Sequence, residues 1–132
     1  MDKKRLDEWI PYAYDALEDL LADEAGKINK TYRGQISNFG VSVINGTLLS
    51  AILFYQEPGN ASTERQLLLE AIKKVLDKDP KIKKESKNYD ALYEYAIARK
   101  NKNEEKIVRD EIITAAPALK LAMNLNELEE TK

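Results

Sequence analysis

SNFGVSVINGTLLSAILFYQ, residues 37–56, is the least polar stretch of this 132-residue sequence, and the polar triplet Asn45-Gly46-Thr47 interrupts it. A helix that crosses a bilayer needs about 20 largely apolar residues, so the interrupted segment is a poor membrane span. Gly46 suits the C-terminal cap of one helix, because the left-handed backbone conformation costs glycine little. Thr47 can begin a second helix that runs through Tyr55. The stretch therefore predicts two helices that meet at a corner inside a protein core.

Apolar positions on both sides of this corner recur at helical spacing. Before it, one helix face is occupied by Ile36, Phe39, Gly40, Val43 and Ile44. After it, most of the helix circumference is apolar, with Leu48, Leu49, Ile52, Leu53 and Phe54. We expect the first helix to start from an N-cap at Thr31. The second should be buried centrally among the other helices.

The rest of the chain indicates further helices. An amphipathic helix near the start, which should stop at Gly26, has its inner face at Trp9, Ala13, Leu17 and Leu20. Thr63 and Gln66 have capping-box spacing. The helix that follows has inward Leu68, Ala71, Ile72 and Val75 and outward Lys73, Lys74 and Lys78. Asp79-Pro80 should end it, which makes KIKKESK, residues 81–87, a connector.

Two more helices complete the prediction. Asn88 can cap a short helix whose core positions are Tyr89, Leu92, Tyr93, Ala96 and Ile97. A long last helix is sustained by Val108, Ile112, Ala115, Leu119 and Ala122. Nowhere do apolar and polar residues alternate over the length of a strand. We predict an all-α fold, a single compact bundle of about six helices, with residues 1–132 as one helical domain.

The composition excludes several classes of protein. The sequence contains no cysteine and no histidine. Disulfides, thiol or imidazole catalysis and zinc sites of the usual Cys/His kind are therefore excluded. Residues 1–21 lack the uninterrupted apolar segment of a secretory signal, so we expect a cytoplasmic protein. We expect no catalytic residues, metal site or cofactor, and neither a membrane nor a small-molecule substrate as partner.

Charge is distributed unevenly along the sequence. Residues 1–26 have a net charge of minus five, residues 27–109 of plus six, and residues 110–132 of minus three. Such a division could give one face of the molecule that attracts an anion. An ordinary solvated surface of mixed charge is the alternative, and the charge pattern alone favours it.

Two groups of basic residues are candidates for electrostatic contact with RNA phosphates. They are Lys27, Lys30 and Arg33 in the first group, and Lys73, Lys74, Lys78 and Lys81 in the second, which belongs to a lysine-rich segment at 73–87. Lysine and arginine bind a phosphate backbone by releasing counterions, without reading bases. Lysines that only keep the surface soluble explain the pattern equally well.

A metal-dependent nuclease is a weaker alternative. Asp79, followed by Glu85 and Lys87, resembles a nuclease signature, but that signature normally lies on adjacent strands that bring its acids to one ion. The evenly spaced glycines at 34, 40 and 46 do not follow a strand as phosphate-binding loops do. Neither pattern therefore predicts a catalytic or nucleotide site.

YRGQISNFGVSVINGTLLSAILFYQE, residues 32–57, together with the preceding DALEDLL and the following helix with a Ser/Thr start, resembles a known family. The family is the small α-helical subunit of type III-B CRISPR effector complexes, the fifth of the Cmr proteins. The resemblance extends over nearly the whole chain in helix order. It is sharpest where Asn38-Phe39-Gly40 leads to the Gly46-x-Leu48 corner and the aromatic pair Phe54-Tyr55.

The resemblance implies a non-catalytic subunit in antiviral defence. Such a subunit stacks on copies of itself beside the crRNA-bearing backbone and helps to hold guide and target RNA. Its partners would be other Cmr subunits, including the backbone and large subunits, and the crRNA and target RNA. Arg33 matches the basic residue at the start of the central helix, whereas Gly46 and Leu48 match the structural corner. An adaptor that binds only proteins remains the alternative.

The charge asymmetry suggests how copies could stack. Opposite charges at two ends of the fold would suit head-to-tail packing, a contact that can extend into a filament. Asp15, Asp19 and Asp23 are the acids that we expect to take part.

Overall fold

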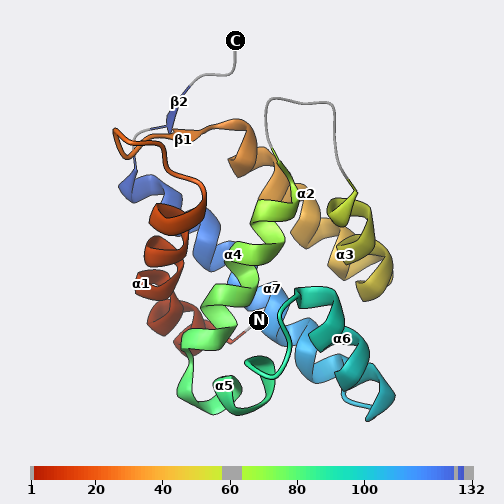
Figure 1. Cartoon of the computed structure of the whole chain (residues 1–132). Coiled ribbons are helices and arrows are strands. Elements are labelled where there is room, and N and C mark those ends of the chain that lie inside the picture. The colour runs from red at the N-terminus through yellow and green to blue at the C-terminus, as the bar shows by residue number, and fades with distance from the viewer. Residues whose placement is uncertain (1, 58–63, 127, 130–132) are drawn as a thin grey trace.

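The protein is all-α, as predicted, in a computed structural model that describes residues 2–57, 64–126 and 128–129 (Figure 1). The helices in this part of the chain are α1 (Lys3–Leu20), α2 (Thr31–Asn45), α3 (Leu48–Gln56), α4 (Gln66–Lys78), α5 (Pro80–Ser86), α6 (Leu92–Asn101) and α7 (Glu105–Ala122). A 3₁₀ turn, η1 (Met123–Leu125), extends α7. Two short strands, β1 (Ile28–Asn29) and β2 (Leu128–Glu129), pair in parallel.

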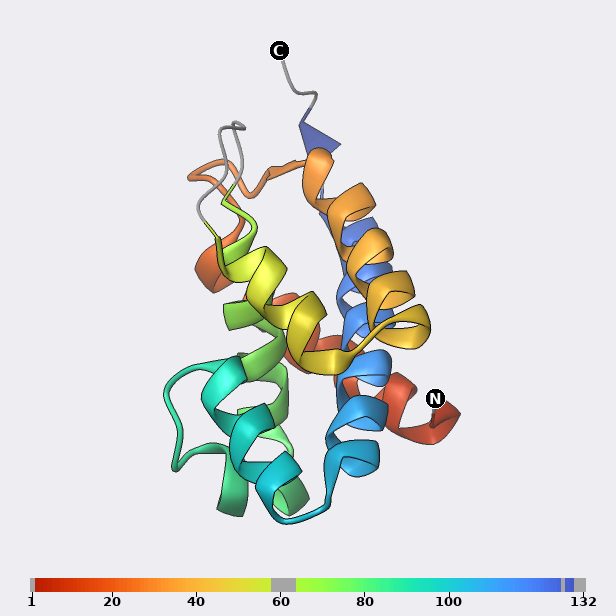
Figure 2. The ribbon, with the colours of Figure 1, turned by 90° about the vertical axis from the view of Figure 1, so that its right-hand side faces the viewer.

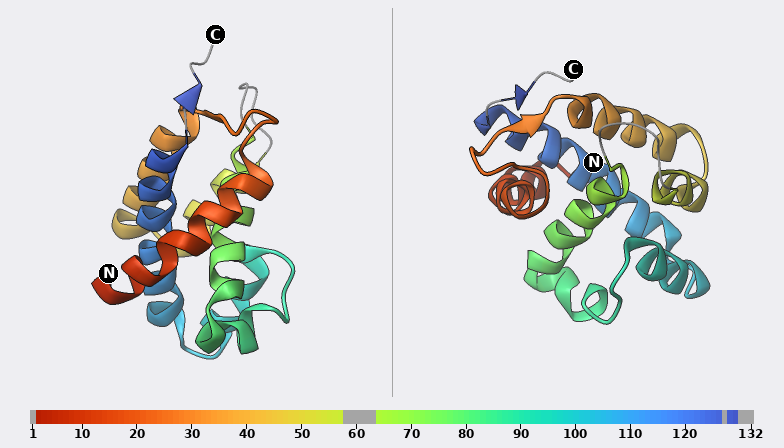
Figure 3. Two further views of the ribbon diagram at one scale, coloured as in Figure 1. Left: turned by 90° about the vertical axis from the view of Figure 1, so that its left-hand side faces the viewer. Right: turned by 45° about the horizontal axis from the view of Figure 1, so that its top comes forward.

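Helix α7 is the central element of the fold. It packs against α1, α2, α4 and α6, and α2 runs alongside it (Figure 2). Helix α1 crosses α7 at an angle on another side (Figure 3). The predicted stripe of Val108, Ile112, Ala115, Leu119 and Ala122 is completely buried, which confirms the interpretation of the last helix.

The inner faces of α1 and α4 are also as predicted, except that Leu20 of α1 is only partly buried. In α1, Trp9, Ala13 and Leu17 are fully buried, and in α4 so are Leu68, Ala71, Ile72 and Val75. These two helices pack against each other as well as against α7. Helical periodicity thus located the core correctly on three helices. In the described residues, no helix is both long enough and apolar enough to cross a membrane.

The corner between α2 and α3 is confirmed, and Gly46 caps α2 as predicted, but its backbone conformation is not the predicted one. Its backbone is extended, with φ −117° and ψ −152°, rather than left-handed. Glycine suits the position for another reason, because a Cβ there would lie 2.9 Å from the backbone oxygen of Ser42. The nearby backbone oxygen of Ser42, in the last turn of α2, leaves no room for a side chain at this position. This lack of room, and not a left-handed conformation, explains the glycine.

The predicted central burial of the second apolar helix is wrong. Leu48, Ala51, Ile52 and Tyr55 of α3 face the core, whereas Leu53 is 48% exposed and Phe54 58% exposed. Helix α3 lies at the right-hand edge of the fold in Figure 1 and packs mainly with α2, α4 and α6. On α2, Val41 and Ile44 are exposed as well. An apolar circumference therefore does not mean that every side of a helix is covered.

Several predicted helix boundaries also need correction. Helix α1 ends at Leu20, and Gly26 lies beyond it in a turn with φ +78°. Thr31 is the first residue of α2 rather than its cap. Asn88 precedes α6 by several residues, and Glu94 instead accepts a 3.0 Å hydrogen bond from the Ala91 N–H before that helix. The predicted cap at Thr63 lies outside the described residues.

The lysine-rich segment predicted as a connector forms helix α5. Asp79 caps it, since its Oδ1 accepts a 2.8 Å hydrogen bond from the backbone N–H of Lys81. Pro80 occupies the first helical position, where its missing N–H has no intrahelical partner to lose. Ile82 and Ser86 are buried one turn apart. The Asp-Pro pair ends α4 as expected, and it also starts another helix.

Candidate nucleic-acid interface

Lys73, one of the predicted phosphate-binding residues, is buried rather than directed outward. Its side chain is 5% exposed, and its Nζ lies 2.8 Å and 2.9 Å from the two carboxylate oxygens of Asp77, one turn along α4. Asp77 Oδ1 also accepts a 2.6 Å hydrogen bond from the Ser86 hydroxyl of α5. Lys73 therefore contributes to the junction between α4 and α5.

The other two α4 lysines of the predicted set form ion pairs with α1. Lys74 Nζ lies 3.2 Å from Asp19 Oδ2, and Lys78 Nζ lies 3.1 Å from Asp15 Oδ2. All four side chains are substantially exposed, so each pair contributes at most about 1 kcal/mol to stability. The acidic face of α1 and the basic face of α4 thus lie side by side and partly neutralise each other.

Lys81 belongs to a different group, which lies on α5. Four α5 or adjoining lysines are exposed: Lys81, Lys83, Lys84 and Lys87. None of their ammonium groups forms an ion pair with any residue in the described part of the chain. Because Ile82 and Ser86 take the buried side of the helix, the lysines occupy the remaining circumference. This cluster, Lys81 to Lys87, is called the α5 lysine cluster below.

Sequence reasoning included only Lys81 of this cluster among the candidate residues. The signal for the other three was the spacing of Ile82 and Ser86, which fits one buried helix face. Because residues 81–87 were predicted to be a connector, this helical spacing was not used to place the lysines. The structure therefore places the unpaired positive charge on α5 rather than on α4.

The first predicted basic group lies at the other end of the molecule. Lys27 and Lys30 flank β1, and Arg33 is in the first turn of α2. Figures 1 and 2 both show β1 and the start of α2 at the end opposite to α5. The structure does not bring the two predicted groups together into one surface.

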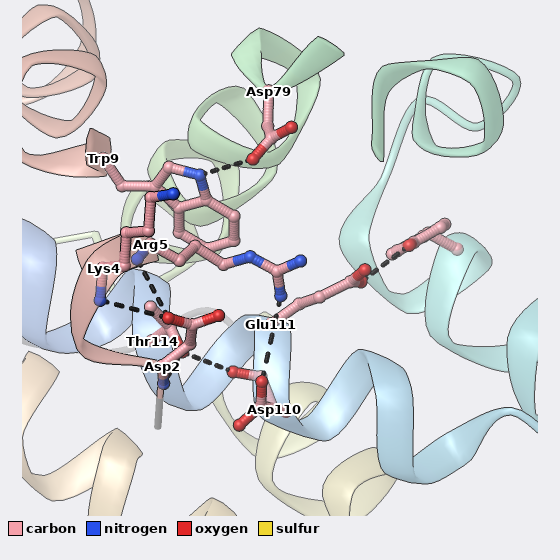
Figure 4. A network of polar contacts seen from close by, with 9 residues as sticks. Asp2, Lys4, Arg5, Trp9, Asp79, Asp110, Glu111 and Thr114 are labelled. Atoms are coloured by element: carbon pink, nitrogen blue, oxygen red, sulfur yellow. Dashed lines mark hydrogen bonds and ion pairs between the residues drawn. The ribbon is translucent and has the colours of Figure 1, made fainter. Parts of the chain in front are cut away.

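The acids of the possible nuclease signature have structural partners. Asp79 is 6% exposed, and its Oδ2 accepts a 2.8 Å hydrogen bond from Nε1 of Trp9 (Figure 4). Glu85 Oε2 lies 3.5 Å from Lys102 Nζ and 3.7 Å from a guanidinium nitrogen of Arg99. Across the described residues, no three carboxylates gather in a way that could hold a metal ion. Asp79 and Glu85 thus connect helices in this structure.

A second buried carboxylate lies between α6 and α7. Glu111 is 3% exposed, and its Oε1 accepts a 2.7 Å hydrogen bond from the Tyr95 hydroxyl. Burial raises the pKa of the Glu111 carboxyl and is also the main reason that the pKa of Tyr95 rises. Arg99 lies over the Tyr95 ring, 5.6 Å from its centroid. This pair could not be predicted from the sequence, since no local sequence pattern relates the two residues.

Comparison with known protein families finds a match over most of the chain. A family model described as CRISPR-associated protein (Cas_Cmr5) matches residues 6–122, a range that extends from within α1 to the end of α7. No curated protein and no solved structure matches this chain. The family match covers the helices that carry the α4 and α5 lysines.

Proposed function

This chain belongs to the CRISPR-associated Cas_Cmr5 family, and on that premise we propose that it is a non-catalytic structural subunit of a type III-B Cmr effector complex. In the proposal, it acts in the cytoplasm, stacks with copies of itself beside the crRNA-bearing backbone, and helps to hold guide and target RNA in antiviral defence. The backbone and large subunits would be its other protein partners.

The α5 lysine cluster is the observation that carries the RNA-holding part of this proposal. Its four ammonium groups are exposed and are not neutralised by carboxylates of the described residues. Unpaired lysines on a short helix attract the phosphates of a single strand by releasing counterions, and they need no particular base. The ion-paired Lys74 and Lys78 have less free charge to offer.

The non-catalytic part is supported by the roles of the acids. Asp79 caps α5 and binds the Trp9 indole, and Glu85 pairs with Arg99 and Lys102. Carboxylates with these partners hold neighbouring helices together. Incubation of the purified protein with RNA and Mg²⁺ tests this part, and cleavage that Asp79→Asn abolishes would contradict it.

An apolar groove between α2 and α7 supports the stacking part. It has a volume of about 330 Å³ and is lined mainly by Ile36, Gly40, Val41, Ile44, Ala116 and Pro117. Val41 is 55% exposed and Ile44 59% exposed. Contiguous exposed apolar side chains of this kind are typical of surfaces that contact another protein.

Two matched double variants test the RNA-holding function in the assembled complex. Lys83→Gln with Lys87→Gln removes two charges one turn apart on α5, and Lys74→Gln with Lys78→Gln removes two charges one turn apart on α4. The measurement is target-RNA affinity over a range of salt concentrations. Each phosphate contact with a single strand adds about 0.7 to the salt slope, so the α5 variant should lose about 1.4. The α4 variant should lose less.

A protein-binding adaptor is the second candidate, because the exposed groove residues Val41 and Ile44 can account for protein contacts without any contact to RNA. On this alternative, the lysines of α5 only interact with solvent and with the C-terminal end of their own helix. The α5 and α4 variants would then both have the target-RNA affinity and salt slope of the unmodified complex. That outcome would replace the RNA-holding proposal with the adaptor.

A further inference from the structure

A hollow lies at the corner between α2 and α3. It has no part in the proposed electrostatic contact between the α5 lysine cluster and RNA. Its volume is about 460 Å³, and it is lined by Ser42, Asn45, Gly46, Thr47, Ser50, Ala51, Phe54 and Tyr55. This volume lies within the range of sites that hold small organic groups. The lining combines an aromatic wall with hydroxyl and amide groups and includes no carboxylate. A polyanion could therefore approach it without repulsion from its walls.

Phe54 is exposed, yet the structure holds its ring in place. The guanidinium carbon of Arg65 lies 4.7 Å from the centroid of the Phe54 ring, and Arg65 also donates a hydrogen bond of 3.4 Å to the backbone oxygen of Phe54. The Phe54 and Tyr55 ring centroids are 6.1 Å apart. Phe54 lines the hollow, whereas Arg65 does not.

Tyr55 connects this exposed ring to the core. It is 5% exposed, its hydroxyl donates a 2.7 Å hydrogen bond to the backbone oxygen of Gln35, and its ring lies 5.1 Å from that of Phe39. The aromatic wall is thus built on a buried, hydrogen-bonded side chain. A rigid ring loses little conformational entropy when a flat ligand stacks on it.

Asn45 supplies polar groups to the lining. It is exposed, and its amide makes no hydrogen bond within the described part of the chain. An amide offers both a donor and an acceptor, the combination that recognises the edge of a base. Thr47 and Ser50 are hydrogen-bonded to each other, and Ser42 donates to the backbone oxygen of Asn38. Asn45 is therefore a lining side chain whose donor and acceptor are both without a partner in the described residues.

We propose that this hollow binds one unpaired base of single-stranded RNA, which stacks on Phe54 while the Asn45 amide hydrogen-bonds its edge. The inference rests on the RNA-holding function proposed above and adds a contact that does not depend on counterion release. Stacking on an aromatic ring tolerates any base, because every base has a π-face. Arg65, beside the ring, adds positive charge near the adjoining phosphate.

Photocrosslinking in the assembled complex tests the proposal. Target RNAs carry a single 5-iodouridine at successive positions, and mass spectrometry identifies the crosslinked residue. We expect a crosslink at Phe54 from one position or from a regularly repeated set of positions. Absence of a crosslink to α3 from every position would overturn the proposal.

Variants on α3 provide the matched comparison. Phe54→Leu keeps an apolar side chain and removes the stacking ring, so target-RNA affinity should fall by about 5- to 100-fold with an unchanged salt slope. Phe54→Trp should retain the affinity. Leu53→Ala, at the neighbouring exposed position, should leave it unchanged.

The possible failures can be told apart. If Phe54→Leu binds RNA like the unmodified complex while the α5 variant loses its salt slope, the base site is wrong and the RNA-holding function stands. If neither variant affects RNA binding, both proposals fail. If Phe54→Leu prevents incorporation of the subunit into the complex, the hollow is a protein contact, and the base site is likewise wrong.

Discussion

Nε1 of Trp9 donates a 2.8 Å hydrogen bond to Oδ2 of Asp79, 70 residues further along the chain. Trp9 is completely buried, and Asp79 is nearly so. The other carboxylate oxygen caps α5 by accepting from the backbone N–H of Lys81. One carboxylate therefore joins α1 to the junction of α4 and α5 (Figure 4). This contact is one of several that hold α5 and its lysines in position, together with the Ser86–Asp77 hydrogen bond.

Removal of the indole donor should destabilise the protein. Trp9→Phe keeps much of the aromatic bulk but leaves a buried carboxylate oxygen without its partner, which costs about 1–3 kcal/mol. Urea unfolding followed by circular dichroism measures the change. Asp79→Asn retains an acceptor for the indole and should lose less than Asp79→Ala. Equal losses for these two Asp79 variants would show that the hydrogen bonds contribute little.

Glu111 should make stability fall as pH rises. Burial raises its folded-state pKa above the ordinary 4.5, so between the unfolded and folded pKa the folded protein binds more protons than the unfolded chain. Stability from this group is complete below the unfolded pKa and is lost as pH rises through the folded pKa. Glu111→Gln should therefore be more stable than the unmodified protein at neutral pH, and the difference should vanish in acid.

Tyr95→Phe is the companion variant for this prediction. The Tyr95 hydroxyl donates to the Glu111 carboxylate and thereby holds the pKa of Glu111 down against the effect of burial. Without the hydroxyl, the pKa of Glu111 should rise further and the loss of stability should extend to higher pH. Unfolding measured at closely spaced pH values checks both variants. Parallel pH profiles for all three proteins would contradict this account.

The fold could be predicted to the extent that it depends on local periodicity. Val108, Ile112 and Leu119 are buried because helical spacing puts them on one face, and that spacing is visible in the sequence. Helix α3 was misjudged because its apolar residues surround the helix. Periodicity then cannot indicate which side is covered, and Phe54 is among the exposed residues.

The candidate site was harder to predict because charges act through partners that are distant in sequence. Lys74 and Asp19 are 55 positions apart, and Lys78 and Asp15 are 63 apart. The sequence shows the sign of each of these charges, whereas only the packing of α1 against α4 determines that they neutralise each other. Lys83 and Lys87 remain available for the opposite reason, since no carboxylate of the described residues forms an ion pair with them.

The two glycines near the corner should respond differently to alanine. Gly46→Ala places a methyl group 2.9 Å from the Ser42 backbone oxygen, which cannot move without disturbing α2, so the protein should be destabilised. A Cβ at Gly40 meets nothing within 4 Å. Gly40→Ala should stabilise the protein by about 0.5–1 kcal/mol through its helix propensity. Thermal unfolding measures both changes, and destabilisation by Gly40→Ala would contradict the contrast.

A charge swap separates the internal role of the α1 acids from their proposed role in stacking. Asp19→Lys alone places two ammonium groups together and should cost up to about 1 kcal/mol. Addition of Lys74→Asp restores an ion pair in which the two charges have exchanged helices. The free energy of unfolding should then return to that of the unmodified protein. Assembly with neighbouring subunits is then measured by native mass spectrometry. If the swapped protein assembles normally, Asp19 takes no part in head-to-tail stacking.

Lys73 should behave as a stability residue and not as an RNA-binding one. Lys73→Gln leaves the Asp77 carboxylate near the core without its ammonium partner, and Asp77 also binds Ser86. We expect a loss of about 1–3 kcal/mol, against less than about 1 kcal/mol for the exposed pair broken by Lys74→Gln. Urea unfolding of the two single variants measures this difference. Lys73→Met with Asp77→Asn, which removes both charges and keeps an amide oxygen as acceptor for Ser86, should recover much of the loss, because no buried charge then lacks a partner. Complexes built with this double variant should bind target RNA with an unchanged salt slope, whereas a reduced slope would mean that Lys73 contacts phosphate in the assembled complex.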